Sequence, residues 1–190
     1  MKLMEEKILS EGKVYPGGVL KVGSFLNHNL DCGFLLEVAK EIASLYKDSG
    51  ITKVLTVESS GIAIAVLVGA VMNVPALFAK KHKTTNLSGE VYSSVVHSYT
   101  HNTDYTIVAE KQFLNKEDTV LLVDDFLAEG NAILGLLDIC KQAGVSVAGA
   151  AIAIEKSFQS GGKKLREAGL RVESMAQIES MDSNIIKFRP

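Results

Sequence analysis

The chain has 190 residues, of which 47% are hydrophobic and 22% are charged, and its net charge is −2 at pH 7. This composition is that of an ordinary globular protein, so a disordered chain is excluded, and two cysteines are too few for a fold held together by disulfides. The length suits one compact domain. A pI of about 6.1 argues against a general nucleic-acid-binding protein, although a local basic patch is compatible with it.

Neither a membrane span nor a secretion signal is evident. The longest apolar stretch, residues 62–72, contains Gly69 and is far shorter than the roughly 20 residues that cross a bilayer. At the N-terminus, Glu5 and Glu6 stand where a signal peptide would begin its apolar run. Cys32 and Cys140 are far apart and form no C-x-x-C pair. We therefore expect a cytoplasmic protein with reduced thiols.

Helical and extended segments alternate along the first part of the chain. Apolar side chains recur at helical spacing over residues 31–47, where Asp31 is placed to cap the helix and Ser49-Gly50 to end it. A run that is apolar nearly all round ends before Pro75 and predicts a buried helix up to Met72. Short strands are predicted on either side of this helix, at residues 53–57 and 76–80.

The middle of the chain changes character. Residues 80–91 are polar and basic, and two strands, 92–96 and 105–109, are predicted to form a hairpin with its turn around His101 and Asn102. The strongest strand signal is at 118–123, whose unbroken apolar run suits a strand covered on both faces. After it we expect a helix over 132–143 that ends at Gly144, a strand over 145–154, a helix over 160–168 and a last core strand over 170–173.

This order of elements predicts an α/β fold with a mostly parallel sheet flanked by helices. Residues 1–30 do not follow the alternation. With the C-terminal tail, from about residue 176 to 190, they are expected to form a small hood on a single domain that spans residues 1–190. The hairpin, with the basic segment before it, is expected to act as a mobile lid.

The most informative chemistry lies at the end of the 118–123 strand, in the run 120–132. Four apolar residues are followed by Asp124 and Asp125, and then by a short loop with Gly130 that opens a helix. Backbone N–H groups and a helix N-terminus converge in such a loop, which suits a phosphate, and Gly130 allows close backbone approach. The acids would accept hydrogen bonds from sugar hydroxyls or hold a water on Mg²⁺. The run predicts a site for a phosphorylated sugar; in the simpler interpretation, the acids are only turn and cap residues.

Two further segments are candidates for binding an anion. The turn Glu58-Ser59-Ser60-Gly61 follows the 53–57 strand, and its small residues let successive N–H groups face an anion such as pyrophosphate, although an ordinary helix N-cap explains it equally well. The basic run Lys80, Lys81, His82 and Lys83 is either a solvated loop or part of a lid whose cations meet a departing anion and exclude water.

The run 120–132 resembles the signature of the type I phosphoribosyltransferases for 5-phosphoribosyl 1-pyrophosphate (PRPP), and the resemblance extends over nearly the whole chain. It is closest to the bacterial xanthine phosphoribosyltransferases, through residues 20–27, 58–61, 120–132 and 154–157. The resemblance implies that the 5′-phosphate is held by Ala128, Glu129, Gly130, Asn131 and Ala132, and the ribose hydroxyls by the catalytic Asp124 and Asp125. It assigns the pyrophosphate to Glu58, Ser59, Ser60, Gly61 and Lys81, and the purine to Leu20, Asn27 and Lys156.

One position departs from the family pattern. The family usually has Asn-Gly where this chain has Glu129-Gly130. A carboxylate beside a phosphate weakens binding of the phosphate unless the carboxylate points outward.

The resemblance implies a homodimeric enzyme of purine salvage that transfers the 5-phosphoribosyl group of PRPP to xanthine, giving XMP and pyrophosphate. Mg²⁺ would be bound mainly through the substrate, with no metal ligand set from the protein. The bond from C1 to pyrophosphate would break with oxocarbenium character. Asp124 or Asp125 would then stabilise the positive ribose, and the metal and the lid lysines the leaving group. No general base is evident.

The chemistry of the purine contacts favours xanthine. The three donors of Lys156 suit the O6 atom of an oxopurine, and the Asn27 amide can donate to a carbonyl at C2, where guanine presents an amino donor instead. An unpaired buried donor costs about 1–3 kcal/mol, so this difference selects between the two purines. Leu20 would supply an apolar wall. In the simpler interpretation Lys156 only reaches solvent, and Phe126 and Phe158, which could stack on a purine, belong to the core.

Two rival functions remain open. The first is the same reaction on guanine, hypoxanthine or adenine. The second is a regulator that senses PRPP and binds nucleic acid, which the net charge and the short N-terminal segment disfavour. A nucleotide kinase is a weaker alternative because no G-x-x-x-x-G-K-[ST] run is present. We interpret His28, His97 and His101 as structural and Cys140 as a core residue.

Overall fold

The structure is a computed structural model, and it describes residues 1–81, 89–98, 103–182 and 185–189. Two of the sequence predictions, the hairpin turn at His101 and Asn102 and the role of His82 and Lys83 in a lid, lie outside the described residues. No helix in the described ranges is both long and apolar enough to cross a membrane.

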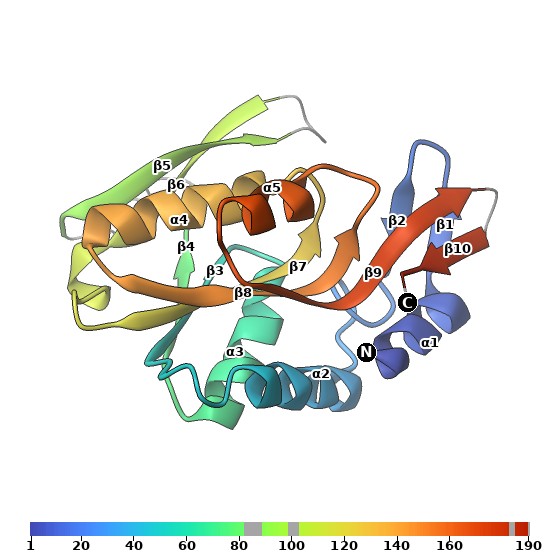
Figure 1. Cartoon of the computed structure of the whole chain (residues 1–190), viewed down its shortest axis with the longest axis horizontal. Helices are drawn as coiled ribbons and strands as arrows, with labels where there is room; N and C mark the ends of the chain where they lie inside the picture. Colours follow the sequence, from blue (N-terminus) through green and yellow to red (C-terminus); the bar gives the residue numbers. More distant parts are fainter. Residues whose placement is uncertain (82–88, 99–102, 183–184, 190) are drawn as a thin grey trace.

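A twisted sheet runs through the centre of the molecule (Figure 1). In the described part of the chain it has six strands in the order β10-β9-β8-β7-β3-β4. These are β3 (Lys53–Val57), β4 (Ala76–Ala79), β7 (Thr119–Leu127), β8 (Ser146–Lys156), β9 (Val172–Asp182) and β10 (Ile185–Phe188). Neighbouring strands are parallel except β10, which pairs antiparallel with β9. The predicted α/β fold with a mostly parallel sheet is confirmed.

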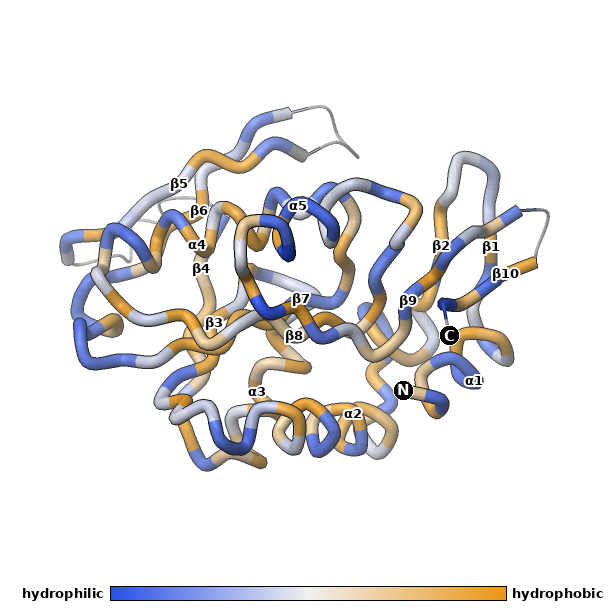
Figure 2. Tube along the Cα trace, in the orientation of Figure 1, coloured by the Kyte–Doolittle hydropathy of each residue, from blue (hydrophilic) through white to orange (hydrophobic). Residues whose placement is uncertain are grey.

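Helices cover both faces of this sheet, as its two-sided burial requires. The helices α2 (Cys32–Leu45) and α3 (Gly61–Met72) lie on one face, and α4 (Asn131–Ala143) and α5 (Gly161–Glu167) lie on the other (Figure 1). Each face has its own apolar core. Figure 2 shows that the central strands and α3 are mainly hydrophobic, whereas α5 is mainly hydrophilic.

Capping and stop residues in the sequence correctly predicted where several helices begin or end. The Asp31 carboxylate caps α2 by accepting the N–H of Phe34 at 3.1 Å. Gly144 ends α4 with a φ of 71°, a left-handed conformation that favours glycine. The prediction that α2 continues to Ser49-Gly50 was wrong, because the helix ends at Leu45.

Two strands are longer than predicted. The strand β7 continues through Asp124 and Asp125 to Leu127, and β9 extends to Asp182 instead of ending at residue 173. The reason is pairing. After a register shift between Val120 and Leu121, β7 stays paired with β8 as far as Leu127. β9 pairs with β8 as far as Ile178 and with β10 as far as Asp182. A neighbouring strand satisfies backbone N–H and C=O groups whatever the side chain, so polar residues do not end a strand that has a partner.

The first 30 residues form an unpredicted helix, α1 (Lys2–Glu11), and a small hairpin of β1 (Lys13–Tyr15) and β2 (Val19–Lys21). Within α1, Met4 and Ile8 are the buried residues, a spacing too sparse to mark an amphipathic helix in the sequence. The C-terminal tail extends the central sheet as the end of β9 and as β10, and it lies beside β1 and β2 in Figure 1. The hood was expected from residues 1–30 together with the C-terminal tail; below, the name is used for α1, β1, β2 and the turn between the two strands.

The predicted lid hairpin consists of β5 (Val91–Ser98) and β6 (Thr103–Glu110), and a 3-10 helix, Lys111–Phe113, follows it. The hairpin packs on α4 because Gly135 leaves room for it: a Cβ atom there would lie 2.5 Å from Val96 and 3.1 Å from Ile107. Lys80 connects the hairpin to the end of β4 through two backbone hydrogen bonds with Val108, of 2.9 and 2.8 Å. The hairpin therefore lies close to the carboxyl ends of the central strands.

Candidate functional site

The loop 128–132 connects the end of β7 to the start of α4. Gly130 has a φ of 86°, a conformation that side chains rarely adopt, and it is the N-cap residue of α4. Among the described residues, no side chain caps this helix, so its first N–H groups are available to an anion. The Asn131 amide donates to the backbone oxygen of His97 at 2.9 Å, which ties the start of α4 to β5.

The loop rests on the start of α5. The N–H of Gly161 donates to the oxygen of Ala128 at 3.0 Å. A Cβ atom on Gly161 would lie 2.5 Å from the carbonyl carbon of Glu129 and 2.6 Å from the nitrogen of Gly130, so only glycine fits there without moving the loop. The Glu129 side chain also reaches this region, where its carboxylate contacts Ser160 and Lys164.

Two cavities adjoin the loop. The larger, of about 530 Å³, is lined by the loop, Asp124, Phe126, Lys156 and part of the hood. The smaller, of about 280 Å³, shares Asp124, Phe126 and Ala132 with the first. It is also lined by Glu58, Ser59, Ser60, Gly61, Lys81 and Asp125. The structure thus brings the two predicted anion segments together on opposite sides of Asp124.

The acid pair separates into a buried and a more accessible carboxyl group. Asp124 is 9% exposed, and its Oδ1 atom accepts the N–H of Asp125 at 3.0 Å. Burial, and then the charge of Asp125, raise the pKa of Asp124 well above its usual range, while the charge of Lys81 acts in the opposite direction. The Oδ2 atom of Asp125 accepts a hydrogen bond of 3.3 Å from the Asn27 amide. Asp125 therefore joins the predicted sugar-binding run to the predicted purine-binding loop.

The turn 58–61 is arranged by its neighbours. The Oε1 atom of Glu58 accepts the N–H of Lys81 at 2.6 Å, and the peptide bond between Glu58 and Ser59 is cis. Ser60 is the N-cap residue of α3, but in the described structure its side chain makes no capping hydrogen bond. A Cβ atom on Gly61 would collide with the Thr56 hydroxyl, so glycine lets this turn close against β3.

Lys81 and Tyr105 face the smaller cavity together. The Lys81 ammonium lies 5.4 Å from the centre of the Tyr105 ring. Burial, and secondarily the charge of Asp124, raise the pKa of Tyr105. Tyr105 belongs to no motif that the sequence shows, and His97, which was expected to be structural, lines the larger cavity. Both belong to the hairpin, and only its packing on the domain places them here, so no local motif marks them.

Lys156 lies at the end of β8 and points into the larger cavity. Its ammonium donates to the oxygen of Gly18 in the hood at 2.9 Å and lies 5.6 Å from the centre of the Phe126 ring. Burial lowers the pKa of Lys156. Leu20, in β2 of the hood, is 6% exposed and packs in the core, whereas Val19 beside it lines the cavity.

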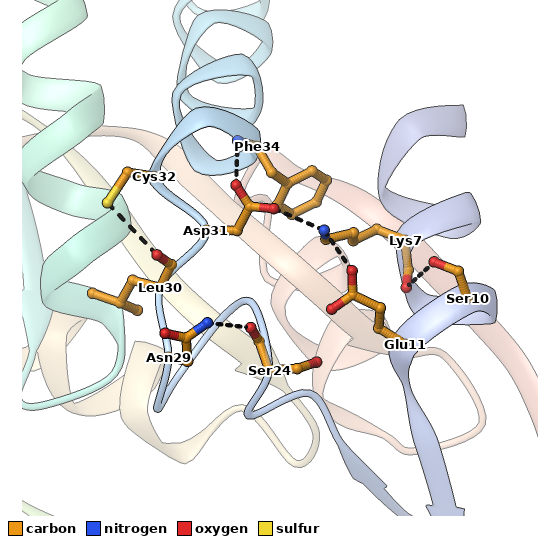
Figure 3. Close-up of polar contacts among 9 residues, drawn as sticks. All are labelled: Lys7, Ser10, Glu11, Ser24, Asn29, Leu30, Asp31, Cys32 and Phe34. Atoms are coloured by element: carbon orange, nitrogen blue, oxygen red, sulfur yellow. Dashed lines mark hydrogen bonds and ion pairs between the residues drawn. The ribbon is translucent and has the colours of Figure 1, made fainter.

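A polar cluster holds the loop that carries Asn27 against the hood (Figure 3). The Lys7 ammonium of α1 pairs with Glu11 at 2.6 Å and with Asp31 at 2.7 Å. Within the loop, the Asn29 amide donates to the oxygen of Ser24 at 2.8 Å. The ion pair with Asp31 therefore joins α1 to the end of the loop that carries Asn27.

No three His, Cys, Asp or Glu side chains in the described ranges cluster as a set of metal ligands. The carboxylates of Asp124 and Asp125 line the smaller cavity and are the hard oxygen groups that suit Mg²⁺ directly or through water. The residues present therefore fit a metal ion that is held largely by a ligand's own oxygens.

Comparisons with known proteins identify the family of this chain. A family model described as "Phosphoribosyl transferase domain" matches residues 31–182. A xanthine phosphoribosyltransferase of Limosilactobacillus reuteri is 50% identical over 99% of this chain and 98% of its own length. One of Bacillus cereus is 48% identical over 99% of this chain and 95% of its own length.

Among solved structures, an adenine phosphoribosyltransferase of Giardia lamblia in complex with 9-deazaadenine superimposes with a TM-score of 0.78 at 25% identity, covering 93% of this chain and 98% of that one. The enzyme of the same name from Rhodothermus marinus has a TM-score of 0.76 at 20% identity, covering 93% and 99%, and shares the fold.

Proposed function

The chain belongs to the phosphoribosyltransferase family, and on that premise we propose that it is a xanthine phosphoribosyltransferase of purine salvage. It converts xanthine and PRPP to XMP and pyrophosphate. The observation that carries the reaction class is the meeting of two cavities at Asp124, with a phosphate loop and Lys156 on one side and the turn 58–61 on the other. The relatives of nearly the same length, which carry this name, support xanthine as the acceptor.

PRPP spans the two cavities in this proposal. Its 5′-phosphate binds the backbone N–H groups of residues 128–132 at the start of α4. Its ribose hydroxyls donate to Asp124 and Asp125. Its pyrophosphate occupies the smaller cavity, where the turn 58–61 supplies backbone N–H groups and Lys81 supplies positive charge.

Xanthine lies in the larger cavity beside Phe126. Lys156 uses one of its three donors on Gly18 and keeps two for O6 of the purine. The Asn27 amide has one N–H on Asp125 and offers the other to the C2 carbonyl. Leu20, expected as an apolar wall for the purine, has its side chain in the core, and Val19 beside it lines the cavity.

The chemical step is a displacement at C1 of the ribose. The bond from C1 to the pyrophosphate oxygen breaks, and both electrons leave with pyrophosphate. A purine nitrogen forms the new bond to C1, and the imidazole N–H proton of the purine passes to solvent. The acid pair stabilises the positive charge that develops on the ribose, and Lys81 stabilises the negative leaving group. Bound through PRPP oxygens and within reach of Asp124 and Asp125, Mg²⁺ would supply further positive charge to the pyrophosphate.

We propose that the enzyme acts as a homodimer in the cytoplasm. The edge strand β4 and helix α3 leave apolar side chains on the surface, with Val66 52%, Val71 38% and Phe78 37% exposed. A second copy of the chain covers this face. Both cysteines are free, which suits a reducing compartment.

Pyrophosphate release from PRPP, measured with xanthine, guanine, hypoxanthine and adenine in turn and with and without Mg²⁺, tests the function. We expect xanthine to have the highest kcat/KM and turnover to require Mg²⁺. A clear preference for another purine would identify that purine as the substrate instead of xanthine. PRPP binding without turnover of any purine would favour a sensor, and tight nucleic-acid binding at low salt would identify it as a regulator.

A further inference from the structure

We propose that Lys164 is a positioning residue for PRPP: together with Ser160 it holds the Glu129 carboxylate on the α5 side of the phosphate loop, away from the bound phosphate. This inference rests on the proposed function. The Ser160 hydroxyl donates to Oε2 of Glu129, and the Lys164 ammonium lies 3.6 Å from the same oxygen. Glu129 is 30% exposed and Lys164 is 58% exposed, so the contact lies at the rim of the site.

The need for such a contact follows from charge. The loop 128–132 offers a left-handed glycine and an uncapped helix start, the features of an anion site, yet it carries a carboxylate in its middle. A free carboxylate there would repel a phosphate dianion across a few ångströms. With Lys164 as its counter-charge, the loop can contain Glu129 and still bind phosphate.

The backbone determines which way Glu129 points. The hydrogen bond from Gly161 to Ala128, at 3.0 Å, and the close approach of Gly161 to Gly130 fix one side of the loop against α5. Ser160 precedes Gly161 directly, and Lys164 lies one helical turn further on. The partners of Glu129 are therefore on the element that already supports the loop.

A double-mutant cycle tests the proposal. The variants are Lys164→Met, Glu129→Gln and the double variant, and the readouts are ribose 5-phosphate binding by calorimetry and the KM values of PRPP and xanthine. We expect Lys164→Met to weaken ribose 5-phosphate binding and raise the KM of PRPP about three- to tenfold at low salt, as for one charge pair near a protein surface. The KM of xanthine stays unchanged, and the effect shrinks as salt is added.

The decisive variant is the double one. Once Glu129→Gln has removed the negative charge, loss of Lys164 should no longer weaken ribose 5-phosphate binding. Lys163→Met is the matched control, because Lys163 is on the same helix, is 78% exposed and pairs with Glu167 at 3.7 Å. We expect it to bind and turn over PRPP like the wild type.

Two results would overturn the inference: an equal loss in Lys163→Met and Lys164→Met, which would indicate a general charge effect, or a loss in Lys164→Met that persists with Glu129→Gln, which would indicate packing. Failure of the wild type to bind ribose 5-phosphate or to release pyrophosphate would instead refute the proposed function. The wild-type measurement therefore separates the two failures.

Discussion

The residues proposed for the sugar phosphate lie in one continuous segment, 124–132, whereas the polar groups proposed for the purine come from two distant parts of the chain. Asn27 lies in the loop that ends at Asp31, the partner of Lys7 in α1. Lys156 ends β8 and contacts the hood turn at Gly18. The first subsite is set by local backbone conformation and the second by the docking of the hood on the sheet. Changes in the segment should therefore affect PRPP, and changes in the hood should affect xanthine.

Asp125→Ala should affect both PRPP and xanthine, because Asp125 belongs to both subsites. We expect kcat to fall about a hundredfold or more, the size typical for removing a group that stabilises transition-state charge. The KM of xanthine should rise as well, because Asn27 loses its 3.3 Å partner. Steady-state kinetics with each substrate varied measures both effects. Asp48→Ala, an exposed site, is the control, and a wild-type rate in Asp125→Ala would mean that the acid is only a structural residue.

Lys156→Met tests the purine side alone. Loss of a charged donor should raise the KM of xanthine about ten- to a hundredfold. Binding of ribose 5-phosphate should change little, as measured by calorimetry. Lys47→Met, at an exposed position, provides a comparison of equal charge. An equal loss of affinity for both substrates would remove Lys156 from the purine site.

Gly161→Ala tests whether α5 shapes the loop 128–132, to which we assign the 5′-phosphate of PRPP. The new Cβ atom would lie 2.6 Å from the nitrogen of Gly130, so the phosphate loop must move. We expect a loss of about 1–3 kcal/mol in ribose 5-phosphate affinity, the usual size of an overpacking penalty. In Gly33→Ala the new Cβ atom has its nearest neighbour at 3.8 Å, and this variant should bind normally. Unchanged affinity in Gly161→Ala would mean that α5 does not shape the loop.

Lys7→Met should have the smallest effect on the kinetics, and it tests whether the hood contributes to xanthine binding. It removes the ammonium that joins α1 to Asp31 and leaves the loop around Asn27 less well fixed. The KM of xanthine should rise about two- to fivefold, in line with a partly exposed ion pair, with the KM of PRPP unchanged. Lys2→Met removes the more exposed pair with Glu6 and should have no effect on either value. A rise in the KM of PRPP alone would contradict this role of the hood.

Features that depend on neighbours in the chain could be predicted from the sequence. The alternation of apolar runs predicted the parallel sheet and its covering helices. The run 120–132 predicted a buried strand and a helix that starts after Gly130, because these signals act over a few residues. The Asp31 cap and the Gly144 stop are further examples. The family resemblance was visible for the same reason, since its motifs are short and contiguous.

Features that depend on residues far apart in the sequence emerged only when whole elements packed together. Pairing with β8 carried β7 past its acids, and the packing of the hairpin on α4 placed Tyr105 and His97 at the cavities. The docking of α5 against the phosphate loop gave Glu129 its partners. Side-chain periodicity within one segment carries no information about its distance from another segment, so these contacts could not be predicted from the sequence.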